Sequence, residues 1–84
     1  MLNIISTRYD GDTFSYITAE INNDEKVEKV IVRIKPDWNN RVIDIMVYFK
    51  SGRIATYDSG LSNHRMPLKY RTYIKEIIKR IERE

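Results

Sequence analysis

Apolar and polar side chains alternate through the middle of the chain. Over residues 28–35, Val30, Val32 and Ile34 take one side of an extended segment, because successive side chains of a strand point to opposite faces. The alternation continues over residues 42–50, where one face carries Ile43, Ile45, Val47 and Phe49. The pattern predicts two neighbouring strands, each with one face in a core.

Three further strands follow from composition and turn residues. Residues 2–9 and 13–21 are rich in β-branched and aromatic side chains and flank the turn Asp10-Gly11-Asp12. A short fifth strand over residues 53–57 follows Ser51-Gly52, a pair typical of a two-residue hairpin. The pattern does not decide which side chains of the first two strands point toward the core and which point away from it.

A two-residue hairpin at Ser51-Gly52 would fix how the last two strands pair. It places Lys50 opposite Arg53, and Met46 opposite Tyr57. The hairpin therefore predicts that Tyr57 lies on the same face of the sheet as Met46.

The clearest periodicity belongs to the last segment of the chain. Apolar residues recur there at helical spacing and form a stripe of Tyr70, Tyr73, Ile74, Ile77, Ile78 and Ile81. The stripe predicts an amphipathic helix over residues 67–83, with Pro67 at its first position, where a missing N–H costs nothing. We therefore expect a single α+β domain over residues 1–84. Its strands, over residues 2–57, should form an antiparallel β-meander of four to five strands, with the C-terminal amphipathic helix packed on one face.

A single helix covers only one face of such a sheet, so the other face should remain open. The predicted open face combines apolar and basic side chains, unlike a face meant only for water. It comprises Lys29, Ile31, Arg33, Lys35, Val42, Met46, Tyr48, Lys50, Arg53 and Tyr57. We expect a partner to cover it.

Positive charge is concentrated in the second half of the chain. The formal net charge is +3, and residues 41–84 carry ten basic and five acidic side chains. This distribution is compatible with an anionic partner.

Little in the sequence supports catalysis. Cysteine is absent, His64 is the one histidine, and no serine has a base at a recognisable spacing. The aspartates beside Gly11 lack the rest of a calcium loop and are more simply turn formers. We therefore expect no enzyme activity, no metal and no cofactor. Neither a membrane-spanning run nor a signal peptide is apparent, which favours a cytoplasmic protein.

Nucleic-acid binding is the leading functional hypothesis. On the predicted open face, cations stand beside aromatic rings that could stack bases, and Trp38 lies in a loop between two basic strands. The candidate contacts, with single strands favoured, are Lys29, Arg33, Lys35, Trp38, Tyr48, Lys50, Arg53 and Tyr57.

The predicted helix adds a second group of candidate contacts. Arg71, Lys75 and Lys79 recur every four residues, about 6 Å apart along the helix axis, and could follow a phosphate backbone. A solvated face is the alternative interpretation. Just before the helix, His64 and Arg65 either hold an anion at the helix N-terminus or are exposed loop residues.

Protein binding is the competing hypothesis. Tyrosine, methionine and arginine are also enriched at protein interfaces, so the open face could equally meet a protein. The chain would then be a homodimer, or a small virus- or plasmid-type protein that modulates or inhibits a host protein.

The order of strands followed by one helix over residues 28–81 resembles, in outline, the single-strand-binding domains of transcriptional positive cofactors. The resemblance is topological and implies an antiparallel sheet with one helix. A fold does not determine a function, so no residue roles are carried over.

Overall fold

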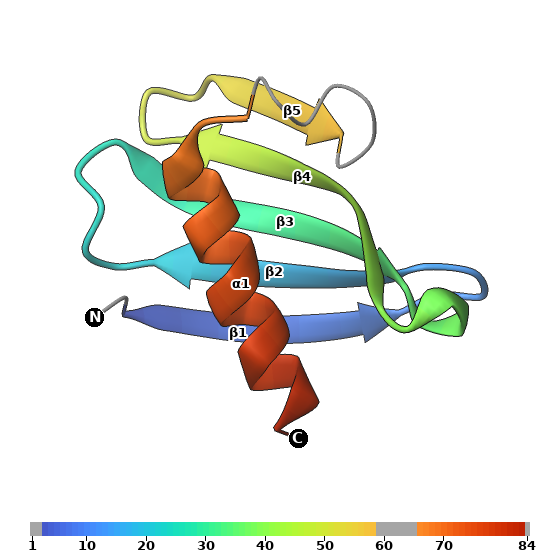
Figure 1. Cartoon of the computed structure of the whole chain (residues 1–84). Helices are drawn as coiled ribbons and strands as arrows, with labels where there is room; N and C mark the ends of the chain where they lie inside the picture. The colour runs from blue at the N-terminus through green and yellow to red at the C-terminus, as the bar shows by residue number, and fades with distance from the viewer. Residues whose placement is uncertain (1–2, 59–65, 84) are drawn as a thin grey trace.

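The computed structural model describes residues 3–58 and 66–83 of the 84-residue chain. Five strands, with a short 3-10 helix η1 between β3 and β4, are followed by one α-helix (Figure 1). Each strand pairs antiparallel with the next, so the sheet order is β1-β2-β3-β4-β5. The bounds are β1 Ile4–Asp10, β2 Ser15–Ile21, β3 Val27–Lys35, η1 Pro36–Trp38, β4 Arg41–Phe49, β5 Ile54–Asp58 and α1 Leu68–Glu82. The predicted fold class, an antiparallel meander with a helix on one face, is confirmed.

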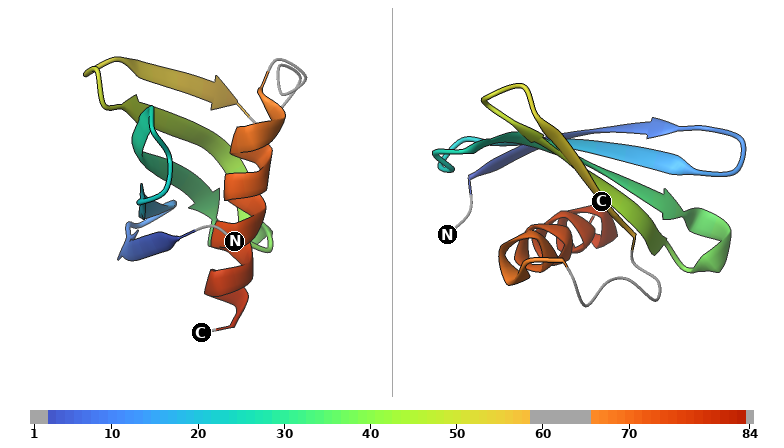
Figure 2. Two further views of the ribbon diagram at one scale, coloured as in Figure 1. Left: turned by 90° about the vertical axis from the view of Figure 1, so that its left-hand side faces the viewer. Right: turned by 90° about the horizontal axis from the view of Figure 1, so that it is seen from above.

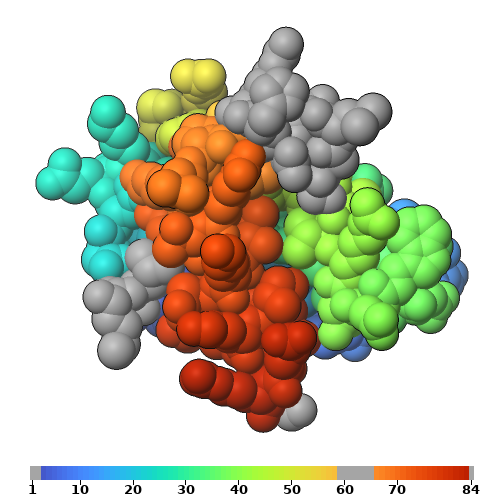
Figure 3. Space-filling view, in the orientation of Figure 1, coloured from blue at the N-terminus to red at the C-terminus, as the bar shows by residue number. Residues whose placement is uncertain are grey.

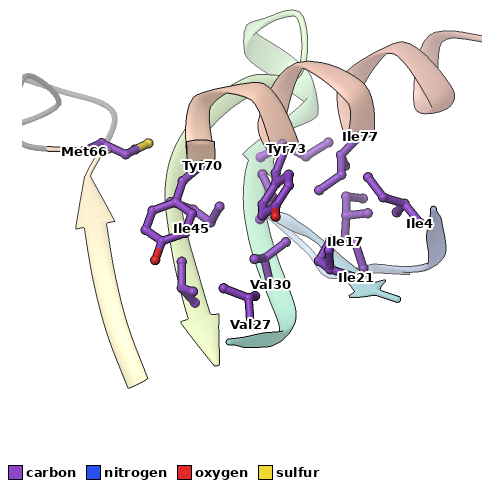
Figure 4. Close-up of a cluster of buried hydrophobic side chains, with 14 residues drawn as sticks. Ile4, Ile17, Ile21, Val27, Val30, Ile45, Met66, Tyr70, Tyr73 and Ile77 are labelled. Atoms are coloured by element: carbon purple, nitrogen blue, oxygen red, sulfur yellow. The ribbon is translucent and has the colours of Figure 1, made fainter. Parts of the chain in front are cut away.

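The helix lies against one face of the sheet and leaves the other face open (Figure 2). Beneath it, Val30, Val32 and Ile34 of β3 and Ile45 and Val47 of β4 are fully buried, as their alternation predicts. From the helix, the buried side chains in the same cluster are Tyr70, Tyr73 and Ile77 (Figure 4). Burial of a large aliphatic side chain contributes about 1.5–3 kcal/mol, so this layer is the main source of stability.

The helix runs across the sheet, from beside β5 at its first turn to β1 near its end (Figure 1). At the β5 end, the ring centroids of Tyr57 and Tyr70 lie 5.6 Å apart. At the β1 end, Arg80 Nη1 donates a hydrogen bond of 2.7 Å to the carbonyl oxygen of Ile4. Pro67 has an extended backbone and immediately precedes the helix, so its prediction as the first helical residue was wrong by one position.

The hairpin between β4 and β5 has a three-residue loop, and the predicted two-residue turn was wrong. The N–H of Phe49 donates to the carbonyl of Arg53, and the N–H of Gly52 donates to the carbonyl of Phe49, both at 2.9 Å. Gly52 has a φ of +95°, as a turn followed by a left-handed residue requires. The pairing moves by one residue, which puts every side chain of β5 on the face opposite to the predicted one.

A register shift between β3 and β4 produces a second difference from prediction. The pairing changes between Arg33 and Ile34, so Val42 lies opposite Ile34 and packs against the core. The prediction that Val42 lies on the open face was therefore wrong. A bulge of this kind adds one residue to one strand and reverses the alternation beyond it.

Asp24 ties the turn between β2 and β3 to the helix. Its side chain is 3% exposed, and it accepts the N–H groups of Lys26 and Val27 at 2.9 and 3.0 Å. Lys69 Nζ lies 2.6 Å from Oδ2, and the hydroxyl of Tyr73 donates to the same oxygen. Burial alone would raise the pKa of Asp24, but these hydrogen bonds hold it well below its usual range. Burial and the neighbouring carboxylate raise the pKa of Tyr73.

Candidate functional site

The open face consists of three rows of side chains that run across all five strands. Because the pairing is continuous, each row takes one residue from every strand. In order from β1 to β5, the rows are Ile5, Glu20, Lys29, Tyr48, Ile54; then Thr7, Thr18, Ile31, Met46, Thr56; and Tyr9, Tyr16, Arg33, Asp44, Asp58. These fifteen residues are called the open face below.

Charges on the open face nearly cancel. Lys29 and Arg33 are its basic residues, and its acidic residues are Glu20, Asp44 and Asp58. Arg33 Nη2 lies 2.6 Å from Asp44 Oδ2, and Asp44 is largely buried, so this pair is already neutralised within the protein. The predicted excess of positive charge is therefore not found on this face.

The centre of the open face is apolar and slightly hollow. Ile31 stands on the middle strand in the middle row, with Met46 beside it. A depression of about 220 Å³ is lined by Tyr16, Ile31, Arg33, Asp44 and Met46. A protruding apolar side chain of a partner could fill it.

Four predicted contacts, Lys29, Arg33, Lys35 and Tyr48, lie at or near the open face as expected. Lys29 Nζ is 4.9 Å from the centre of the Tyr48 ring. At the opposite end of β3, Lys35 Nζ is 4.3 Å from the centre of the Trp38 ring, which is 55% exposed. Lys29, Lys35 and Tyr48 thus combine cations with rings, although each ring already holds a cation of its own chain.

Arg53 lies on the other side of the molecule, at the end of the sheet beside the start of α1. Lys50, at the tip of the hairpin, borders both sides, because it also lines a hollow with Glu20 and Lys29 of the open face. Together with Lys26, Lys50 and Arg53 surround a hollow of about 560 Å³. The N–H of Lys50 donates to the carbonyl of Lys26 at 2.9 Å, so the two turns that carry these cations are joined. The hollow, called the hairpin-end pocket below, is lined by Glu25, Lys26, Phe49, Lys50, Ser51, Arg53 and Tyr70.

The cations of the hairpin-end pocket are available to a ligand. Within residues 3–58 and 66–83, Lys26, Lys50 and Arg53 form no ion pair. The guanidinium of Arg53 lies 5.6 Å from the centre of the Phe49 ring, which holds it over the pocket wall. An anionic group with an apolar body would meet both charge and a ring here.

The predicted row on the helix is exposed and lies on the same side as this pocket. Arg71, Lys75 and Lys79 all point outward from the buried stripe of α1. Lys79 Nζ is 3.9 Å from Glu76, too far for a strong exposed pair. Figure 3 shows this side, called the helix side below, with the two turns of the pocket next to each other beside the first turns of the helix.

Tyr57 is not on the open face, and this prediction was wrong. It pairs with Ile45, is partly buried and packs against the core beside Tyr70. Burial and the neighbouring Tyr57 raise the pKa of Tyr70. The loop residues His64 and Arg65 lie outside the described residues.

Sequence reasoning missed Lys26 and the contribution of the first two strands. Tyr9 and Tyr16 lie 6.2 Å apart between ring centroids and extend the open face toward β1. No local pattern in the sequence predicts that Lys26 lies beside Lys50, because the hydrogen bond between their turns depends on the pairing of β3 with β4.

Comparisons with protein-family models, with curated proteins and with solved structures give no match. Among the described residues, no three His, Cys, Asp or Glu side chains are grouped as a metal site would require. Neither helix in the described part of the chain is long and apolar enough to cross a membrane. The candidate site therefore consists of two surfaces, the helix side and the open face.

Proposed function

We propose that this protein is a small, non-catalytic nucleic-acid-binding module that holds phosphates on its helix side. The observation that carries the proposal is the hairpin-end pocket, where Lys26, Lys50 and Arg53 meet without an ion pair among the described residues. The exposed row on α1 continues this positive surface. Cations gathered in this way attract a polyanion and release its counterions when it binds.

The number of cations predicts how strongly salt should weaken binding. Three cations in the pocket and three on the helix could neutralise about six phosphates. Log K should then fall with log salt with a slope of about −4 on a single strand and about −5 on a duplex. Between 50 and 200 mM salt, single-strand binding should weaken roughly 300-fold.

The test compares two variants that each lose three positive charges. The helix variant carries Arg71→Gln, Lys75→Gln and Lys79→Gln. The control carries Lys29→Gln, Lys35→Gln and Arg41→Gln, which removes the same charge from the opposite side. Binding of labelled single-stranded DNA, duplex DNA and RNA is followed by fluorescence anisotropy.

We expect the helix variant to lose about half of the single-strand salt slope, and the control to keep it. The preferred strand would then name the nucleic acid. If the control loses the slope instead, the contact lies on the open-face side and the proposed site is wrong. If the native protein binds none of the three nucleic acids at 50 mM salt, the proposed function is wrong.

Protein contact is the second candidate function, and a separate observation favours it. On the open face, the edge residues Ile5 and Ile54 are 56% and 51% exposed, and Tyr9 is 70% exposed. With the apolar centre around Ile31 and Met46, they form a broad surface of the kind that proteins cover. Its occupant would be a second copy, giving a homodimer, or a host protein that this chain modulates.

A further inference from the structure

We infer that the open face is covered by a second copy of this chain, so that two sheets pack face to face and both helices lie outside. The inference deepens the protein-contact candidate and does not depend on nucleic-acid binding. It rests on the area of the face, on its charge and on the position of its apolar centre.

The area of the open face meets the requirement of a specific dimer. Five strands at about 4.8 Å and about six residues at 3.3 Å give roughly 24 by 20 Å, or about 500 Å² of flat area on each copy. Two copies would bury about 1,000 Å², the lower limit for a specific interface. We therefore expect a dimer of micromolar affinity rather than an obligate one.

The charge of the open face suits a second copy better than a polyanion. The chain carries a net charge of +3, and two copies should repel each other through most of their surface. The open face, however, carries three carboxylates beside its two cations, and Arg33 is already paired with Asp44. A surface that carries both positive and negative side chains can pack against a copy of itself, whereas its carboxylates would repel the phosphates of a nucleic acid.

The position of the apolar centre also fits two-fold symmetry. In an isologous dimer, the residue at the centre of the face lies close to its own copy. That residue is Ile31, on the middle strand and in the middle row.

The test measures the oligomeric state by sedimentation equilibrium without nucleic acid, from about 1 μM to about 1 mM protein. Ile31→Asp should raise the dimer dissociation constant at least about a hundredfold, because it places an unpaired charge at the centre of the interface. The matched control is Thr72→Asp on the exposed side of α1, which adds the same charge and should leave the dimer intact. Far-UV circular dichroism confirms that each variant folds.

A second measurement does not depend on the folding of the aspartate variant. Since the chain has no cysteine, Ile31→Cys creates a single thiol. Face-to-face sheets lie about 10 Å apart, so a short bis-maleimide should link two Ile31→Cys chains but not two Thr72→Cys chains. A native protein that stays monomeric up to 1 mM would overturn the inference, as would a dimer that neither crosslinks at position 31 nor weakens in Ile31→Asp. A monomer that still binds nucleic acid with the predicted salt slope would leave the proposed function standing.

Discussion

Replacing Asp24 by alanine should destabilise the fold more than any single change on its surface. The carboxylate is 3% exposed and has four partners from two regions of the chain. Without it, the hydroxyl of Tyr73 and the N–H of Val27 remain buried with no acceptor. The other partners suffer less, since Lys69 is about half exposed and can be solvated by water.

The magnitude follows from the groups left without a partner. Each buried donor without an acceptor costs about 1–3 kcal/mol, and the half-exposed pair with Lys69 adds at most about 1 kcal/mol. Counting the two buried donors near the lower end of this range, we expect Asp24→Ala to lower the free energy of unfolding by about 3–4 kcal/mol. A domain of 84 residues has roughly 4–13 kcal/mol in total.

Urea unfolding followed by far-UV circular dichroism measures this change. At an m-value of about 1 kcal/mol/M, the midpoint should fall by about 3 M. Two companion variants separate the contributions. Tyr73→Phe removes one hydrogen bond to the carboxylate and should cost about 1–2 kcal/mol, whereas Lys69→Met should cost less than about 1 kcal/mol.

The order of these three variants is the decisive result. If Lys69→Met destabilises as much as Asp24→Ala, the exposed ion pair supplies the stability and the argument from buried donors fails. An Asp24→Ala midpoint within about 0.5 M of the native value would show that water replaces the carboxylate at no cost.

Two further predictions concern the loss of stability at low pH and the glycine in the β4–β5 loop. The pKa of Asp24 is lower in the folded chain than the ordinary value of 3.8, so its stabilisation is complete above about pH 5 and is lost progressively as the pH falls. The urea midpoints of the native protein and Asp24→Asn should therefore approach each other below pH 4, and a constant gap from pH 6 to pH 2.5 would contradict the prediction. Gly52 has a positive φ and open space around its Cβ position, so Gly52→Ala should cost about 1 kcal/mol and lower the Tm by about 4–8 °C. Ser51→Ala removes only an exposed 3.5 Å contact with the N–H of Arg53 and should lower the Tm far less. An unchanged Tm for Gly52→Ala would mean that the loop relaxes.

The elements in which apolar residues recur at a regular spacing could be predicted from the sequence. Alternation places Val30, Val32 and Ile34 under the helix, and the structure buries all three. The helical stripe is likewise confirmed, with Tyr70 and Ile77 facing the sheet. In both cases the signal lies within one segment, so no knowledge of neighbouring segments is needed.

The candidate site was less predictable because it depends on pairing between segments. Ser51-Gly52 fits a two-residue turn and a three-residue loop equally well, since both can use a glycine at positive φ. The loop has three residues, and a one-residue shift moves a strand's side chains to the other face. Arg53 thereby joins Lys26 on the helix side, and Tyr57 enters the core.

Asp24 shows the same limit for a buried polar group. In the sequence it stands among Asn22, Asn23 and Glu25 and indicates no more than a polar turn. Its partner Tyr73 is 49 residues away. The sequence predicts Asp24 as a turn former, but its burial depends on the docking of the helix, which brings Lys69 and Tyr73 onto the carboxylate.

The contacts of the helix have a consequence for how the chain acquires its structure during synthesis. Each strand pairs with its neighbour in sequence, so the sheet can grow hairpin by hairpin. The helix instead closes distances of 49 residues to Asp24 and 76 residues to Ile4. At roughly 5–20 residues per second, the helix is made about 1–5 s after β5. Until it docks, the nascent sheet exposes apolar side chains on both faces. That interval is when this chain is most prone to aggregate.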